Sequence, residues 1–296
     1  MMIYLNAMSQ GVLWGIMGIG LYITFRILRF ADLTSEASFT MGVSVAVSLL
    51  TQGVSPLLAT VAAVFGGMLS GYVTGILMTV FDIPSLLAGI ITLTGFYSIN
   101  LRIMGKPNVS LRKFPTIYDE GISTVFNTTL GQRTVIGLLI VIIVVVILSV
   151  FFRTDLGQAM IATGDNEIMA KSLGIKTASM KRFALVLANG IIGLAGALVA
   201  QDNSFGDISM GNGTVVVALS SIVIGEVLFK QLTMQLRLLA IVLGSVIYRV
   251  ILVFVLQLGF NANDFRLISA MVLAIFLAFP AMSDKMKNIL PMKGGE

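Results

Sequence analysis

The run TVIGLLIVIIVVVILSVFF, Thr134–Phe152, carries no charged side chain and decides the fold class of this chain. About 20 apolar residues in a helix span the hydrocarbon core of a bilayer, which is about 30 Å thick. Lipid offers the backbone no hydrogen-bond partner, so a run of this kind crosses the membrane as an α-helix. The sequence therefore predicts an all-α polytopic membrane protein, surrounded by membrane lipid.

The composition of the whole chain agrees with this prediction. Of its 296 residues, 57% are hydrophobic and only 11% are charged, whereas a soluble domain has about 25% charged residues. Too few polar side chains remain to cover a soluble globular enzyme. The formal net charge of +5 reports loop orientation in a membrane protein and does not indicate binding of nucleic acid.

Nine runs of the sequence are apolar enough to enter lipid. They are Met8–Leu28, Ala37–Leu50, Pro56–Phe81, Pro84–Ile103, Thr134–Phe152, Phe183–Ala200, Gly213–Phe229, Leu238–Leu258 and Phe265–Met282. We predict about nine transmembrane segments, with eight and ten as alternatives, in one domain of residues 1–296. Ala37–Leu50 is the shortest and would reach only about 21 Å. A half-span, a re-entrant helix and part of a bent helix all fit this run.

Glycines recur at helical spacing inside these runs. Gly67, Gly71 and Gly75 stand four residues apart. Small residues on one helix face let two backbones approach closely in lipid, so this spacing predicts helix packing.

Positive charges orient the segments. One polar loop, residues 154–182, and the residue just before it hold five of them: Arg153, Lys171, Lys176, Lys181 and Arg182. The positive-inside rule places this loop in the cytoplasm, and nine segments then place residues 105–132 outside.

The outer loop 105–132 and its edges also carry cations. These are Arg102, Lys106, Arg112, Lys113 and Arg133. Several exposed charges can steer the docking of an acidic partner, although each pair contributes little. The set predicts a receptor-docking surface, with a solvated loop as the alternative.

The residues that most enzymes need are missing from the sequence. It has no Cys and no His, which excludes disulfides, thiolate zinc sites and His-based acid–base or haem chemistry. It also lacks the phosphate-binding pattern GxxxxGK[ST], the GxSxG nucleophile elbow and the HExxH zinc motif. We predict that the chain is not an enzyme and holds no metal or cofactor of its own.

Arg249 is the clearest ionisable residue inside a predicted span, Leu238–Leu258. An unpaired Arg at that depth costs at least about 2.5–3.5 kcal/mol on insertion scales, so compensation is expected. Glu226 in the preceding span is one candidate partner, although the two depths match poorly. A water-filled cavity, or a negatively charged part of a transported solute, are the alternatives. Hydropathy adds further candidates for the substrate pathway: Asn100, Asn189, Ser220 and Ser221.

The cytoplasmic loop 154–182 predicts a short helix. Asp165 or Asn166 can cap its N-terminus, and Glu167 then lies in the first turn, where the helix dipole favours an anion. Gly174 fits the left-handed position that ends a helix. An apolar stripe lies between them at helical spacing, made of Ile168, Met169, Ala170 and Leu173. Such a stripe is typical of a partner-binding surface, with a connector lying on the membrane as the alternative.

A family resemblance enters at this loop. Its residues Gly157, Ala162-Thr163-Gly164, Asn166-Glu167, Ala170 and Gly174-Ile175 resemble the coupling loop of ABC importer permeases of the branched-chain amino acid, ribose and nucleoside permease family. The stretches Arg29–Ala37 and Phe183–Gln201 are also similar to that family. Glu226–Lys230 departs from it, because a Gly-rich turn is common there.

The resemblance implies a type II-like ABC importer permease. It implies a second permease subunit, alike or related, together with cytoplasmic ATPase subunits that hold ATP and Mg²⁺ and an extracellular substrate-binding lipoprotein. The residues that would couple the permease to the ATPase are Gly164, Asp165, Asn166, Glu167, Ala170, Leu173 and Gly174.

The pattern is most similar to a subgroup paired with lipoprotein receptors for aromatic amino acids. The expected cargo is accordingly a small solute, an amino acid and within that class an aromatic one, moved by alternating access. A sugar or nucleoside is the alternative cargo. A stand-alone secondary transporter or channel is the alternative function, and it would need an ion site that the sequence does not supply.

Overall fold

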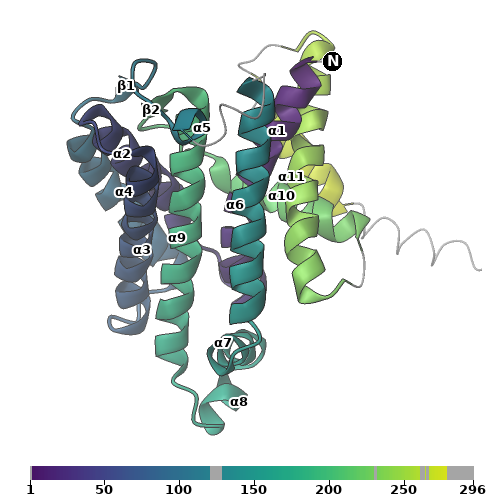
Figure 1. Ribbon diagram of the computed structural model, residues 1–296. Helices are drawn as coiled ribbons and strands as arrows, with labels where there is room; N and C mark the ends of the chain where they lie inside the picture. Colours follow the sequence, from purple (N-terminus) through teal and green to yellow (C-terminus); the bar gives the residue numbers. More distant parts are fainter. Residues whose placement is uncertain (1, 121–128, 230–231, 261–263, 265–266, 279–296) are drawn as a thin grey trace, which may run out of the picture.

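The computed structural model describes residues 2–120, 129–229, 232–260, 264 and 267–278. The elements follow the order α1 (Met2–Tyr22), η1 (Ile23–Ile27), α2 (Thr34–Thr51), α3 (Pro56–Thr79), α4 (Ser85–Met104), β1 (Asn108–Ser110), α5 (Ile117–Glu120), α6 (Thr129–Phe151), α7 (Asp155–Asp165), α8 (Glu167–Ser172), α9 (Thr177–Asn203), β2 (Phe205–Asp207), α10 (Thr214–Leu228) and α11 (Met234–Gln257). A further helix covers Leu267–Ala278. Figure 1 shows the long helices side by side, with α7 and α8 at one end and β1, β2 and α5 at the other.

Six helices of the described residues are long and apolar enough to cross a membrane. They are Met2–Ile27, Pro56–Thr79, Ser85–Met104, Gly131–Phe151, Thr177–Asn203 and Met234–Gln257. The expected number of about nine is therefore not confirmed. The helices α10 and Leu267–Ala278 are shorter than these six, and α2 carries Glu36 and a series of Ser and Thr side chains.

The helix α2 contains the shortest predicted run, Ala37–Leu50, and extends beyond both of its ends. It has 18 residues and so extends over about 27 Å, which is more than a half-span. Its polar side chains Ser35, Ser38 and Ser44 are buried, because α2 packs between α3, α4 and α9. A helix surrounded by protein does not need a lipid-facing surface, and this explains its polar composition.

The first predicted span, Met8–Leu28, does not end as a regular helix. The α-helix α1 continues as the π-helix η1, and Arg29 then takes a left-handed backbone with φ of 59°. Asp32 lies in the turn before α2, and its Oδ1 accepts a hydrogen bond of 3.0 Å from the backbone N–H of Thr34, two residues further on. The helical conformation is thus interrupted between η1 and α2, two largely buried helices.

The helix α9 lies between the group α2–α4 and the group α1, α10 and α11 (Figure 1). Its most extensive packing is against α3, the helix whose glycine spacing predicted close helix packing. A Cβ on Gly67 or Gly71 would overlap the backbone carbonyls of Asn189 and Leu185. These glycines therefore permit backbone contact between the two helices.

One short two-stranded sheet lies within the mostly helical fold. The strands β1 and β2 pair antiparallel, with Val109 opposite Gly206. The following turn stays attached, because the backbone N–H of Leu111 donates to the carbonyl of Ser204 at 2.8 Å. The described part of the loop 105–132 therefore folds onto the end of α9, while residues 121–128 lie outside the described residues.

Candidate functional site

The predicted loop helix exists as α8, and a second helix, α7, precedes it. Asn166 is the N-cap, since its Oδ1 accepts a hydrogen bond of 3.0 Å from the N–H of Met169. Asp165, the other candidate cap, is instead the last residue of α7. Gly174 has φ of +83°, the left-handed geometry expected of a residue that ends a helix.

The apolar stripe of α8 has a free side and a packed side. Ile168, Met169 and Leu173 are 83%, 57% and 67% exposed, whereas Ala170 is buried. We call the three exposed side chains the α8 knob. Ala170 belongs to the packing behind the knob and not to its surface. A groove of about 270 Å³ separates α7 from α8 and includes Met169 and Leu173 in its lining.

Glu167 fastens α8 to α9. Its Oε2 accepts a hydrogen bond of 2.6 Å from Nζ of Lys181, and its Oε1 lies 3.0 Å from Nζ of Lys171 and accepts from the Thr177 hydroxyl at 3.2 Å. The Lys181 hydrogen bond is the main reason that the pKa of Glu167 falls to about 2, with a smaller contribution from Lys171. A carboxylate charged at every physiological pH thus holds the α8 knob against a long helix.

The helix α7 is fastened to the interruption after η1. Gly164 packs directly on the backbone carbonyl of Ile27, where a Cβ would overlap that oxygen. Beside it, a nitrogen of Arg29 lies 2.7 Å from Oδ1 of Asp165. Five of the predicted coupling residues, Gly164, Asp165, Asn166, Glu167 and Ala170, therefore make contacts that shape and hold this end.

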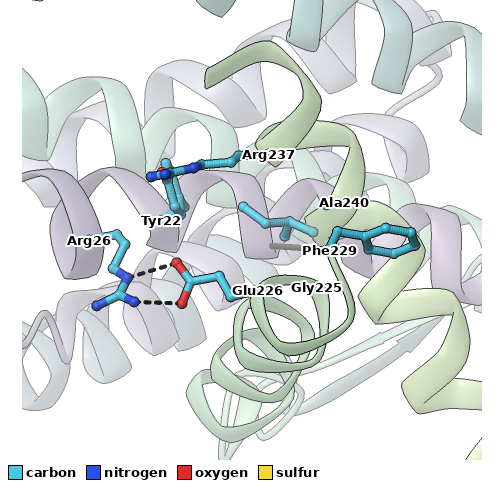
Figure 2. Close-up of a pocket in the computed structure, with 8 residues that line it drawn as sticks. Tyr22, Arg26, Gly225, Glu226, Phe229, Arg237 and Ala240 are labelled. Atoms are coloured by element: carbon cyan, nitrogen blue, oxygen red, sulfur yellow. Dashed lines mark hydrogen bonds and ion pairs between the residues drawn. The ribbon is translucent and has the colours of Figure 1, made fainter. Parts of the chain in front are cut away.

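An ion pair extends these contacts from η1 to α10. Figure 2 shows the Arg26 guanidinium facing both carboxylate oxygens of Glu226, with two hydrogen bonds of 2.7 Å. The pair borders a pocket of about 230 Å³ that Tyr22 and Arg237 also line. Glu226 was the candidate partner of Arg249, and that candidate is wrong, because its carboxylate is held by Arg26 at this end of the molecule.

A buried polar cluster connects α2, α3 and α9, and the sequence indicated only Asn189 of its members. The Asn189 amide donates 3.0 Å hydrogen bonds to Oδ2 of Asp32 and to the carbonyl of Leu185, and its oxygen accepts from Ser38 at 2.6 Å. Ser38 also contacts Ser70 of α3. Asp32 lies between two predicted apolar runs, Met8–Leu28 and Ala37–Leu50. An acidic residue between two such runs is the signal by which the sequence could have indicated Asp32 as a member of this cluster.

The other pathway candidates lie apart from this cluster. Asn100 is buried and donates to the carbonyl of Ala37 at 3.4 Å. Ser220 and Ser221 are buried and donate to carbonyls one turn earlier in α10. Arg249 lies over the ring of Trp14, with 4.6 Å between its Cζ and the ring centroid, and it lines a cavity of about 330 Å³.

The five predicted receptor-docking cations divide into two kinds. Arg102, Lys106, Arg112 and Lys113 are exposed. Arg133 instead lies 3.5 Å from a carboxylate oxygen of Asp202, which is only 7% exposed. Arg133 therefore compensates a buried charge of its own chain, whereas Arg112 and Lys113 extend toward the surroundings.

Comparison with known proteins places the chain in a family. A family described as the permease component of a branched-chain amino acid transport system matches residues 3–277. The chain belongs to this permease family. A tyrosine transport system permease protein of Clostridioides difficile is 41% identical to this permease over 284 residues, which cover 96% of this chain and 93% of the relative.

More distant relatives of this permease are also transport proteins. An inner membrane ABC transporter permease protein of Escherichia coli is 30% identical over 231 residues, which cover 76% of this chain and 67% of the relative. An autoinducer 2 import system permease protein of Yersinia enterocolitica is 27% identical, over 66% of this chain and 51% of the relative. No solved structure matches the chain significantly. The protein is a permease component of an ABC importer and a multi-pass protein of the cytoplasmic membrane.

Proposed function

We propose that this permease moves an amino acid of the aromatic class into the cell, and that a partner ATPase drives it by binding the α8 knob. The observation that supports the docking most directly is the exposure of Ile168, Met169 and Leu173 on a helix fastened to α9. Exposed apolar side chains beside a groove fit a helix-and-groove contact with a partner. ATP and Mg²⁺ would then be held by the partner, and this end would be the cytoplasmic one.

The contacts behind the knob support a mechanical role. Glu167 links α8 to α9, Asp165 links α7 to Arg29, and Arg26 links η1 to α10. A displacement of α7 and α8 would therefore act on α1, α9 and α10 together. Packed helices switch between discrete arrangements and do not deform continuously, so this movement suits alternating access.

The nature of the cargo is inferred from the relatives of the chain. The tyrosine transport permease is 41% identical over nearly the whole chain, whereas the autoinducer permease is 27% identical over two thirds of it. This difference favours an amino acid over a sugar or a nucleoside. A lipoprotein receptor outside the cell and a second permease subunit would complete the importer.

The docking is tested by co-purification. The reading frames adjacent to this one would be searched for an ATPase subunit, that subunit would be co-expressed with the chain, and the amount of ATPase bound would be compared between variants. We expect Ile168→Asp and Leu173→Asp to lose the ATPase, because each places a charge on the α8 knob. Leu156→Asp, a substitution of another exposed apolar residue at this end, is the matched control and should retain it.

A transport assay tests the class of cargo separately from the docking of the ATPase. Membrane vesicles that contain the assembled importer would be assayed for ATP-dependent uptake of L-tyrosine, with D-ribose and a nucleoside as competitors. Uptake that L-phenylalanine inhibits and the other two do not would support the aromatic class. Equal ATPase binding by the α8 knob variants and the unaltered chain would overturn the proposed docking site.

A further inference from the structure

Arg249 holds a positive charge deep in the helix bundle, near the middle of α11 (Met234–Gln257). Its side chain is half-buried, and its Nε is shielded from solvent and has no hydrogen-bond partner in the part of the chain that the structure describes. A cation in this position needs a negatively charged or polar partner.

No carboxylate of the described residues forms an ion pair with Arg249. The acidic residue that acts on its charge is Asp202, and that carboxylate lies beside Arg133. Glu226 is bound by Arg26. The described residues therefore surround Arg249 without supplying the anion that a structural ion pair would require.

The immediate neighbour of Arg249 is an aromatic face. Its guanidinium lies over Trp14, and Trp14 also stacks with the ring of Phe39 at 5.3 Å between centroids. Stacking on a ring holds the guanidinium plane in one orientation and leaves the N–H groups at its edge free to donate. A guanidinium held in this way is arranged for a bidentate contact with a planar anion.

The cavity beside Arg249 has the size and lining of a small-molecule site. Its volume of about 330 Å³ falls within the range of about 300–1,000 Å³ that is usual for ligand pockets. Met210, Val216 and Val217 form an apolar part of the wall, and Asn212, Thr214 and Ser269 add polar groups. The site thus combines one cation with an apolar surface that suits a hydrophobic side chain.

We propose that this cavity is a station on the transport pathway where Arg249 binds the carboxylate of an amino acid. The apolar side chain of the cargo would lie against Met210, Val216 and Val217. This inference rests on the proposed function, because it assigns the chemical class of the cargo to one site of the permease. A lipid phosphate would share the attraction to Arg249, and the experiment separates the two sources.

The chain contains a built-in reporter for this site. Trp14 is the only tryptophan of the sequence, and it contacts Arg249 directly. The full-length permease would be reconstituted in nanodiscs of neutral lipid, without partners, and tryptophan fluorescence would be recorded during titration with L-phenylalanine. Phenethylamine, which lacks the carboxylate, and inorganic phosphate would be titrated in parallel.

We expect a saturable fluorescence change with L-phenylalanine, and none with phenethylamine or phosphate at the same concentrations. In Arg249→Gln the dissociation constant should rise by about tenfold or more, because a charge-assisted hydrogen-bonded pair is lost. Arg249→Lys should bind with intermediate affinity, since it keeps the charge without the planar fork. Arg237→Gln, which removes an Arg from the same helix, should bind as the unaltered chain does.

Three results would overturn the inference: no saturable response in the unaltered chain, an equal response to phenethylamine, or unchanged affinity in Arg249→Gln. An equal response to phosphate would assign the site to phosphate or lipid headgroups and would also overturn it. Because this titration uses no ATPase, it is independent of the co-purification test. Loss of ligand binding with intact ATPase docking would reject this site alone, and the reverse result would reject the proposed coupling alone.

Discussion

Nζ of Lys181 donates a hydrogen bond of 2.6 Å to Oε2 of Glu167 and so joins α8 to α9 across the turn at Gly174. Glu167 also accepts a hydrogen bond of 3.2 Å from the Thr177 hydroxyl of α9, and the two helices share few other contacts, so Glu167 carries much of the attachment of the α8 knob to α9. The proposed transmission of movement from an ATPase depends on it.

Glu167→Gln should loosen α8 without unfolding the membrane helices. The amide keeps the shape of the side chain but loses the charge that Lys181 and Lys171 contact. Hydrogen exchange of the backbone amides of Glu167–Ser172 should become faster, and ATP hydrolysis should drive less transport per ATP. Lys171→Met is the control, since it leaves the Lys181 pair intact, and it should change both quantities less.

The same pair predicts a dependence on pH. The pKa of Glu167 is lowered from 4.5 to about 2, chiefly by the hydrogen bond from Lys181. A carboxylate with a lower pKa in the folded state stabilises that state fully above its unfolded pKa, and the contribution disappears as the pH falls toward the folded pKa. Protection of α8 should therefore be constant above about pH 5 and decrease between pH 4.5 and 2. In Glu167→Gln the decrease should be absent.

The ion pair of Arg26 with Glu226 should respond to a charge swap. Arg26→Glu alone places two carboxylates together, and it should weaken the contact of η1 with α10. The double change Arg26→Glu with Glu226→Arg restores opposite charges and should recover most of the lost transport. Because the Arg26 side chain is 53% exposed, the coupling should be modest, about 1 kcal/mol or less. Additive effects of the two changes would show that the pair does not matter.

Gly164→Val should disrupt the attachment of α7. Any Cβ at this position overlaps the carbonyl of Ile27, which is backbone and cannot move aside. The expected loss of stability is about 1–3 kcal/mol, the usual cost of overpacking, measured as a lower melting temperature of the purified permease. Gly95→Val is the matched control, because nothing lies within 4 Å of a Cβ there. A melting temperature for Gly164→Val equal to that of Gly95→Val would contradict the packing argument.

The features of the site that were predictable from sequence are those that depend on neighbouring residues. The cap at Asn166, the turn at Gly174 and the apolar stripe of α8 follow from side-chain chemistry within one turn of helix. The long helices α6 and α11 follow from hydropathy in the same way. Whether α2 is exposed to lipid was not predictable, because its burial depends on three helices from other parts of the chain.

The contacts between distant residues could not be predicted from these local patterns. Arg26 and Glu226 are 200 residues apart, and Asp32 and Asn189 are 157 apart. Glu226 and Arg249 lie in successive helices, which makes them candidate partners from sequence, but the carboxylate of Glu226 is bound by Arg26 at 2.7 Å. Pairing of charges in a helix bundle depends on depth and helix order together, and neither is encoded within a short window of sequence.

The outer cations should affect receptor docking unequally. Arg112→Glu with Lys113→Glu should lower receptor-stimulated uptake and reduce its dependence on salt concentration, because both side chains are exposed. Arg133→Glu should instead reduce the stability of the permease, since it places a carboxylate beside Asp202. Lys176→Glu in the opposite loop is the control and should leave the salt dependence unchanged. Unaltered uptake in the double variant would count against a docking role for this loop.

Asp32→Asn tests whether the buried cluster of α2 and α9 is structural. The carboxylate of Asp32 accepts from the Asn189 amide and from the Thr34 N–H. With an amide at residue 32, one acceptor oxygen is replaced by a donor. One of the two contacts, to the Asn189 amide or to the Thr34 N–H, is then left unmade inside the bundle. The expected loss is about 1–3 kcal/mol, the cost of a buried polar group without its partner, measured as a lower melting temperature.

A second change can restore the pairing in the Asp32→Asn background. Asn189→Asp returns an acceptor opposite the new amide, so the double variant should melt at a higher temperature than Asp32→Asn alone. Asp119→Asn, a change of an exposed carboxylate in α5, serves as the control for loss of charge and should cost less. Since Asn189 belongs to the helix that Lys181 fastens to α8, Asp32→Asn should also lower transport per ATP. If Asp32→Asn lowers the melting temperature but leaves transport per ATP unchanged, the cluster has a structural role only.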